Sequence, residues 1–259
     1  KKHTTFRVGG PADILVQPKG TELAAVIRLC RKYDVPYQVI GNGSNLLVGD
    51  RGIRGLVIEM LSKEDEICVE DDCITVGAGM LLSKTANRAA EHGLTGMEFA
   101  AGIPGSIGGA VVMNAGAYGG EMKDILTAVT VLDQEGNEKI FSAEELELGY
   151  RTSCILKKGY IVMGAKIKLK HGEETAIRAR MEELKKQRVE KQPLEYPSAG
   201  STFKRPEGYF AGKLIMDAGL RGYLVGEAQV SEKHCGFVIN RGNATAADVR
   251  TLMQNVADI

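Results

Sequence analysis

The sequence predicts an α+β protein in two parts, and two observations support this fold class. In the first 170 residues, short apolar runs alternate with glycine-containing turns, which is typical of short strands joined by tight loops. Residues 173–192 then contain many charges and neither glycine nor proline, which predicts a long helix facing solvent. We therefore expect a domain boundary near residue 170, between a first part at 1–170 and a second part at 171–259.

The first part opens with a helix predicted over 22–34. Leu23, Ile27 and Cys30 recur at helical spacing on one apolar face, and Thr21 is a suitable N-cap. A second helix is predicted over 83–92, and strands are expected at 37–40, 46–48, 55–59, 66–70, 74–78, 127–133 and 138–141.

Capping patterns locate further helices. Ser142 and Glu145 form the capping-box pattern, which predicts a short helix ending near Gly149. Thr245 and Asp248 form the same pattern and predict a helix from residue 246. The second part is completed by a helix near 211–218 and a strand at 235–239.

Composition excludes several classes of protein. Lys plus Arg and Asp plus Glu both number 33, so the charge balance argues against a nucleic-acid partner or a polybasic membrane-surface protein. We find no apolar run of the ~18 residues that a transmembrane helix needs, and no signal peptide. The five cysteines are odd in number and include no Cys-x-x-Cys, which favours reduced thiols in the cytoplasm. The four histidines have no pair at metal-ligand spacing, so we expect no metal site.

Glycine is unusually abundant, with 32 residues, and it gathers in two loops, 41–48 and 101–121. Closely spaced glycines let backbone N–H groups converge on an anion, and the hydroxyls of Ser44 and Ser106 could add donors. Two such loops in one half of the chain suit a dinucleotide with a diphosphate bridge. The alternative is that these glycines only form tight turns. Neither loop fits the Rossmann or the Walker A pattern.

Six segments carry a resemblance to a known family. In chain order they are TTFRVGGPAD (4–13), GNGSNLLV (41–48), AGIPGSIGGAVVMNAGAYGGE (101–121), GYRTS (149–153), AGSTFKRP (199–206) and GEAQVSEKHCGFVIN (226–240). Together they resemble the UDP-N-acetylenolpyruvoylglucosamine reductase family, over essentially the whole chain. The order of the six segments is specific, although each glycine loop alone is a weak signal.

The resemblance implies a more detailed fold and a cofactor. It implies a two-part FAD-binding unit of the vanillyl-alcohol-oxidase (PCMH) type, with subdomains at about 1–62 and 63–170, followed by an α+β substrate-binding domain at 171–259. The loops lack histidine, so we expect noncovalent FAD. The FAD-binding residues are then Gly41, Asn42, Gly43, Ser44, Asn45, Gly102, Pro104, Gly105, Ser106, Gly108, Gly109, Asn114 and Gly116.

The implied reaction is the NADPH-dependent, FAD-mediated reduction of an enolpyruvyl ether on a UDP-sugar, a step of bacterial peptidoglycan synthesis in the cytoplasm. Hydride addition leaves negative charge beside a carboxylate, which requires a cation and a proton donor. By resemblance, Arg151 is the catalytic cation and Ser201 is the proton donor. The expected substrate-binding residues are Tyr150, Lys191, Lys204, Arg205 and Arg221.

The chain departs from the family pattern in three places. The family has a third catalytic group, a glutamate in a Leu-Glu-x-Glu-Val-Arg-like stretch, which does not occur before Ile259, so we expect a C-terminally incomplete domain. Relatives often carry asparagine at the position of Arg205. No tyrosine lies between Tyr160 and Tyr196, which resembles the subclass without an inserted tyrosine loop. Two other functions therefore stay open: another noncovalent FAD oxidoreductase of this fold, or a flavin-binding module with an incomplete active site.

Overall fold

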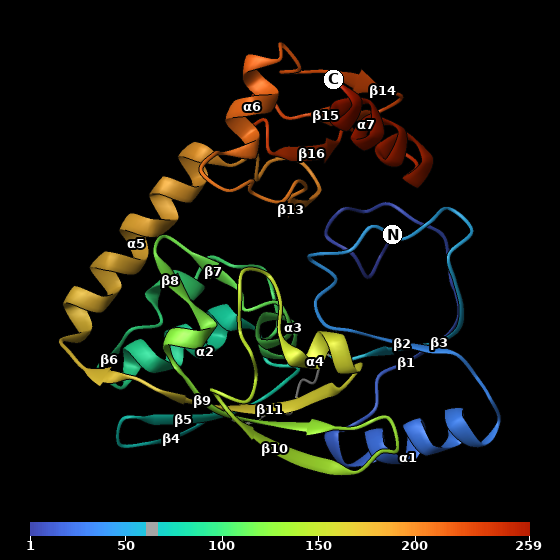
Figure 1. Cartoon of the computed structure of the whole chain (residues 1–259). Helices are drawn as coiled ribbons and strands as arrows, with labels where there is room; N and C mark the ends of the chain where they lie inside the picture. The colour runs from blue at the N-terminus through green and yellow to red at the C-terminus, as the bar shows by residue number, and fades with distance from the viewer. Residues whose placement is uncertain (61–66) are drawn as a thin grey trace. The chain divides into compact units, whose positions relative to one another are not determined.

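The computed structural model describes residues 1–60 and 67–259, and within this range the side chains of residues 20 and 21 are not described (Figure 1). The chain forms two compact units. The C-terminal unit comprises Lys1–Asp13, Gly43–Arg54 and Gln187–Ile259, and the central unit comprises Ile14–Asn42 and Gly55–Lys186.

This division differs from the boundary expected near residue 170, because the amino-terminal segment packs with the carboxy-terminal one. Asn240 Nδ2 donates a hydrogen bond to the Phe6 carbonyl over 3.2 Å, and Phe6 and Val8 are buried in the core of the C-terminal unit. The expected subdomain boundary at 62/63 lies outside the described residues, as does residue 66 of the expected strand 66–70.

The central unit is built on a five-stranded antiparallel sheet, in the order β10-β9-β11-β5-β4. Strand β11 is at its centre, paired with β9 and β5. The strands are β4 (Ile67–Glu70), β5 (Cys73–Gly77), β9 (Leu126–Leu132), β10 (Glu138–Ser142) and β11 (Ile161–Lys168).

Smaller sheets accompany this one. A three-stranded sheet has the order β1-β3-β2, in which β2 and β3 are parallel. Its strands are β1 (Ala12–Val16), β2 (Tyr37–Ile40) and β3 (Ile53–Glu59). Two short antiparallel pairs join β6 (Leu94–Thr95) to β12 (Lys170–His171), and β7 (Gly116–Ala117) to β8 (Gly120–Glu121).

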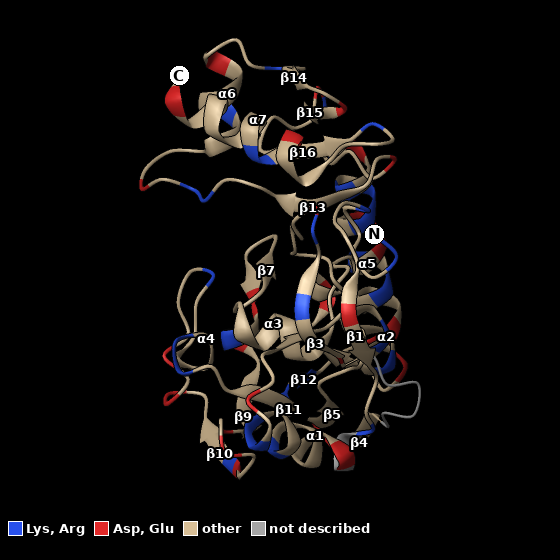
Figure 2. Ribbon diagram, turned by 90° about the vertical axis from the view of Figure 1, so that its right-hand side faces the viewer, with Lys and Arg blue, Asp and Glu red and all other residues tan. Residues whose placement is uncertain are grey.

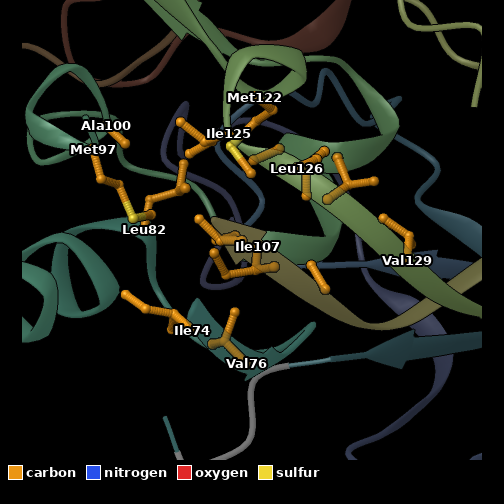
Figure 3. Packing of buried hydrophobic residues seen from close by; sticks show 14 of the residues in the cluster. Ile74, Val76, Leu82, Met97, Ala100, Ile107, Met122, Ile125, Leu126 and Val129 are labelled. Atoms are coloured by element: carbon orange, nitrogen blue, oxygen red, sulfur yellow. The ribbon is translucent and has the colours of Figure 1, made fainter. Parts of the chain in front are cut away.

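A set of helices lies wholly or mostly in the central unit. They are α1 (Gly20–Lys32), α2 (Leu82–Glu91), α3 (Ile107–Val112), α4 (Cys154–Lys158) and α5 (Glu174–Lys191), with 3-10 turns at Glu98–Ala100 and Met122–Asp124. Figure 3 shows Ile107 of α3 among side chains of β5 and β9, including Ile74, Val76 and Leu126. The predicted apolar face of α1 is confirmed, since Leu23 and Ile27 are fully buried against β3. Lysine, arginine and acidic residues mix along α5 (Figure 2), with ion pairs such as Arg178–Glu174.

The C-terminal unit has a four-stranded antiparallel sheet in the order β13-β16-β15-β14, covered by two helices. Asp50 is important for its packing, because its carboxylate accepts hydrogen bonds from the N–H groups of Ala246 and Ala247 at the start of α7, over 2.8 and 2.9 Å. A carboxylate there also complements the helix dipole. The elements are β13 (Ser198–Ser201), α6 (Ala211–Asp217), β14 (Leu224–Val225), β15 (Ala228–Val230), β16 (Phe237–Asn240) and α7 (Ala246–Asp258).

Local capping signals were partly predictive. The Thr245–Asp248 capping box is confirmed and starts α7. The bonds of the Ser142–Glu145 box also form, but they lead into turns rather than the expected helix. The expected strand at 46–48 is wrong, since this segment is irregular. Helix α1 begins at Gly20, with Lys19 rather than Thr21 at the N-cap.

No helix among the described residues is long and apolar enough to cross a membrane. Within the same residues, no group of three or more His, Cys, Asp or Glu side chains could hold a metal ion. All five cysteines are free thiols, and burial raises the pKa of Cys30, Cys154 and Cys235.

The β9–β10 turn predicts an acid-dependent contribution to stability. Asp133 accepts hydrogen bonds from the backbone N–H groups of Asn137 and Glu135, both 2.9 Å, and pairs with Lys139, which together lower its pKa to about 2. The unfolded value is about 3.9. Its stabilisation is therefore present above about pH 4 and is lost as the pH falls through about 2.

We expect Asp133→Asn to lower the free energy of unfolding at pH 7, and the difference from wild type to shrink between about pH 4 and pH 2. Urea titrations across this range measure the difference. The matched control is Glu138→Gln, because Glu138 is exposed on the same hairpin and makes no side-chain hydrogen bond or ion pair with the described residues. A difference that stays constant with pH would contradict this account.

Candidate active site

The GYRTS segment forms a tight turn that presents Arg151. Gly149 and Thr152 exchange both backbone hydrogen bonds, over 3.1 and 3.3 Å, so Tyr150 and Arg151 occupy the tip. Arg151 has a φ of 55°, in the left-handed region. This conformation costs a residue with a Cβ about 1–2 kcal/mol, so the surrounding contacts must hold it.

Those contacts come from the last residue of α3 and the segment that follows it. Arg151 donates hydrogen bonds to the carbonyl oxygens of Asn114 (3.2 Å) and Gly116 (2.9 Å). Asn114 Nδ2 donates to the Gly149 carbonyl (3.1 Å), and Ser153 Oγ donates to the Val112 carbonyl (2.7 Å). Four hydrogen bonds therefore join 149–153 to 112–116, all within the central unit.

Arg151 is a half-buried cation without a carboxylate partner among the described residues. Its guanidinium lies 5.3 Å from the centroid of the exposed Tyr150 ring. The two bonds to carbonyl oxygens use two of its five N–H donors. A partly desolvated guanidinium with donors left over is suited to bind an anion, for which a carboxylate is the geometric match.

Asn114 is fully buried, and its side chain is committed to protein partners. Besides the Gly149 carbonyl, Nδ2 donates to Glu121 Oε2 (2.9 Å), and Oδ1 accepts from the Lys123 N–H (2.9 Å). Glu121 also forms an ion pair with the Lys123 ammonium, which raises the pKa of Lys123. The structure directs the Asn114 side chain to the network around Arg151, and a contact between Asn114 and the cofactor stays a prediction.

Two segments of the predicted cofactor site meet in the central unit. Asn42 Nδ2 donates to the Pro104 carbonyl over 2.7 Å. Gly41 lies directly against Ser106: an added Cβ would overlap with Ser106 Oγ and lie 3.3 Å from Ser106 Cβ. Glycine at 41 is thus required for the close approach of loops that are distant in the sequence.

Ser106 points to a ligand at this junction. It is only 2% exposed, yet its hydroxyl neither caps α3 nor bonds to any other described residue. The Oγ atom is not among the fully buried side-chain atoms of the described residues that lack a partner, so it keeps contact with solvent and its hydroxyl is available to a ligand. Nearby, Gly102, Pro104 and Gly109 are exposed, whereas Gly105 is half-buried.

The other predicted cofactor residues do not lie at the junction of the two loops. Gly108 N–H donates to the Ala78 carbonyl over 2.8 Å, and an added Cβ would lie 3.1 Å from the Ala78 side chain, so this glycine serves packing of α3. Gly43, Ser44 and Asn45 belong to the C-terminal unit. There the Gly43 carbonyl accepts a hydrogen bond from the Thr5 N–H over 3.2 Å.

Ser201, in the C-terminal unit, is exposed at the end of β13. Its register with β16 is irregular between Ser198 and Ser201, and Gly200 between them has a φ of 81°. A left-handed glycine in such a bulge re-aims the next side chain. The Ser201 side chain makes no hydrogen bond to the described residues, so its hydroxyl is available to a ligand.

The basic residues expected to bind substrate are exposed in the same unit. Arg205 donates to the Tyr209 carbonyl (3.2 Å) and lies 4.0 Å from the Phe210 ring centroid, so its position is fixed by its own loop. Lys191 ends α5, Lys204 follows β13, and Arg221 follows α6.

Sequence reasoning missed Glu121, Lys123 and Ser153 as parts of this site. Glu121 and Ser153 lie inside two of the quoted motifs, which is the signal that could have identified them. Their roles depend on hydrogen bonds between segments, and no local pattern predicts these.

Comparison with known proteins identifies the class. Residues 12–142 match the family described as "FAD binding domain", and residues 192–259 match the family described as "UDP-N-acetylenolpyruvoylglucosamine reductase, C-terminal domain". The chain is therefore an FAD-dependent oxidoreductase, in which a flavin-binding domain precedes a distinct carboxy-terminal domain.

Full-length relatives identify the family. UDP-N-acetylenolpyruvoylglucosamine reductase of Agathobacter rectalis is 58% identical over 100% of this chain and 86% of the relative. The enzyme of the same name from Clostridium perfringens (strain SM101 / Type A) is 56% identical over 98% of this chain and 84% of the relative. The crystal structure of UDP-N-acetylenolpyruvylglucosamine reductase from Thermus caldophilus superposes with a TM-score of 0.86 at 41% identity, covering 99% of this chain and 92% of that one. The chain belongs to the UDP-N-acetylenolpyruvoylglucosamine reductase family.

The junction of the two loops fits the FAD that this family membership implies. The Ser106 hydroxyl without a protein partner, and the exposed glycine backbone beside it, supply neutral donors for a diphosphate. Gly41, Asn42, Pro104, Gly105, Ser106 and Gly109 are the residues that would hold it in the central unit.

The contact between the loops can be tested by a double-mutant cycle on protein without bound FAD. Gly41→Ala is expected to lower the free energy of unfolding by about 1–3 kcal/mol, because its Cβ overlaps with Ser106 Oγ. Adding Ser106→Ala removes that oxygen, so the double variant should lose less than the sum of the single losses by about 0.5 kcal/mol or more.

Gly49→Ala is the matched control, because an added Cβ there meets nothing within 4 Å. Its effect should stay within about 0.5 kcal/mol. Strictly additive losses at Gly41 and Ser106 would show that the two loops do not touch.

Proposed function

We propose that this protein catalyses the NADPH-dependent reduction of UDP-N-acetylglucosamine enolpyruvate to UDP-N-acetylmuramate, in bacterial peptidoglycan synthesis. The main support is the similarity to reductases of this name, at 56–58% identity over at least 98% of the chain. The FAD-binding profile over residues 12–142 supports the flavin chemistry. We assign substrate binding to the carboxy-terminal part of the chain, expected from residue 171, and place the reaction in the cytoplasm.

The substrate carries an alkene beside a carboxylate. Bound FAD supplies the hydride chemistry, because it can accept a hydride from NADPH and pass one to the alkene. Hydride addition at the terminal carbon makes the neighbouring carbon carry negative charge, which delocalises onto the carboxylate. We assign Arg151 to bind that carboxylate, because a guanidinium already positioned by the Asn114 and Gly116 carbonyls needs little reorganisation.

A proton must then reach the charged carbon. We assign this step to Ser201, whose exposed hydroxyl at the end of β13 has no protein partner among the described residues. A hydroxyl is a weak acid, so the alkoxide it leaves behind requires donors or cations nearby. We assign the exposed Lys191, Lys204, Arg205 and Arg221 to the diphosphate of the UDP group, and Tyr150 to the substrate beside Arg151.

An absorbance spectrum of the purified protein tests this function directly. Visible flavin bands should disappear on addition of NADPH and return on addition of the enolpyruvyl sugar, without covalent attachment of the flavin. A colourless protein that takes up no FAD, or reduced flavin that the sugar does not reoxidise in the absence of oxygen, would refute the proposal.

Ser201→Ala separates the two half-reactions. The variant should keep its FAD and should be reduced by NADPH at the wild-type rate, since the hydroxyl is assigned only to the later proton transfer. Product formation should fall by about 10²–10⁴-fold, the usual contribution of a positioned proton donor. Stopped-flow absorbance measures both steps under anaerobic conditions.

Ser198→Ala is the control, because Ser198 lies on the same strand and its side chain is assigned no role. Product formation by this variant should stay near the wild-type rate. Normal turnover by Ser201→Ala would remove Ser201 from the mechanism.

A further inference from the structure

We propose that Asn114 is a positioning residue for catalysis, which fixes Arg151 in the orientation that receives the substrate carboxylate. The inference rests on the proposed function. It adds to the catalytic machinery a residue whose side chain would touch neither substrate nor FAD. Its basis is the arrangement of hydrogen bonds within the central unit.

The first argument is saturation of the Asn114 amide. A carboxamide has two N–H donors, and here these donate to Glu121 Oε2 and to the Gly149 carbonyl, while its oxygen accepts from the Lys123 N–H. The residue is 0% exposed. Such a side chain has no donor left for a ligand, but it holds the turn that carries Arg151 through Gly149.

The second argument is that Asn114 also holds the guanidinium itself, through its main chain. Arg151 Nη1 donates to the Asn114 carbonyl over 3.2 Å. Asn114 has a φ of 41°, in the left-handed region. Asparagine is among the few residues other than glycine that adopt this left-handed conformation routinely. One residue thus fixes both the backbone that carries Arg151 and the head of its side chain.

The third argument concerns the chemical nature of the groups that bind the Arg151 guanidinium. Two bonds to uncharged carbonyl oxygens orient the guanidinium without neutralising it, whereas a carboxylate at the same place would compete with the substrate. Glu121, an acid of the same network, is instead engaged by Asn114 and by Lys123. The network therefore orients the Arg151 guanidinium and leaves its charge available to pair with a ligand.

The experiment is a double-mutant cycle on the FAD-loaded enzyme. Asn114→Gly keeps a residue that tolerates positive φ but removes the amide. In the wild-type background we expect it to slow reoxidation of the reduced flavin by the enolpyruvyl sugar by about 10–100-fold, as a small misplacement of a catalytic group does. In the Arg151→Ala background the same change should have an effect of less than about threefold, because Asn114 acts through Arg151.

Three measurements distinguish positioning of Arg151 by Asn114 from a merely structural role of this residue. FAD content and the rate of flavin reduction by NADPH should match those of wild type. Asp133→Asn, which weakens the β9–β10 turn of the same unit without removing any bond of the Asn114 network, should leave the sugar step unchanged. If Asn114→Gly does not fold, Glu121→Ala removes one bond partner of the amide and is expected to slow the same step, with Glu121→Gln restoring it because an oxygen acceptor is kept.

Equal effects of the Asn114 change in both backgrounds would overturn the inference, as would loss of FAD or slower reduction by NADPH. Loss of FAD or slower reduction by NADPH would instead favour the predicted role of Asn114 in binding FAD. Failure of the proposed function itself is recognisable separately, because wild-type protein would then not be reoxidised by the sugar at all.

Discussion

Four hydrogen bonds between residues 112–116, at the end of α3, and the 149–153 turn are the constraint on which the candidate active site depends. They hold a left-handed Arg151 in a two-residue tip and aim its guanidinium at two carbonyl oxygens. Without these bonds the turn would relax to a backbone conformation of lower free energy for arginine. The energy that keeps Arg151 strained comes from the buried amide of Asn114 and the buried hydroxyl of Ser153.

The same constraint explains why this site favours an anion. A half-buried guanidinium without a carboxylate partner among the described residues is costly to desolvate, and its charge is offset by two carbonyl dipoles and the neighbouring Tyr150 ring. An incoming carboxylate recovers that cost by a charge-assisted pair. The glycine loops follow a different principle, because they present neutral backbone and the Ser106 hydroxyl, which has no partner among the described residues; such neutral donors suit a diphosphate.

Each compact unit uses a long-range polar contact to fix a loop against an ordered element. In the C-terminal unit, the Asp50 carboxylate caps α7 and so holds the 43–54 segment, which has no regular structure of its own before β3. In the central unit, Asn42 and Gly41 meet Pro104 and Ser106. Loops that lack strand or helix hydrogen bonds require such contacts to satisfy their backbone groups.

The α+β class followed from the sequence alone, as did the family, through six ordered motifs, and the elements with a strong local signal, such as the capping box of α7 and the apolar face of α1. The sequence could not determine that Asn114 serves Arg151, nor that the amino-terminal segment packs in the C-terminal unit. Asn114 and Gly149 are 35 residues apart, and Phe6 and Asn240 are 234 apart. Capping and apolar periodicity are local signals, whereas these pairings exist only after folding has brought distant loops together, so they could be seen only in the folded chain.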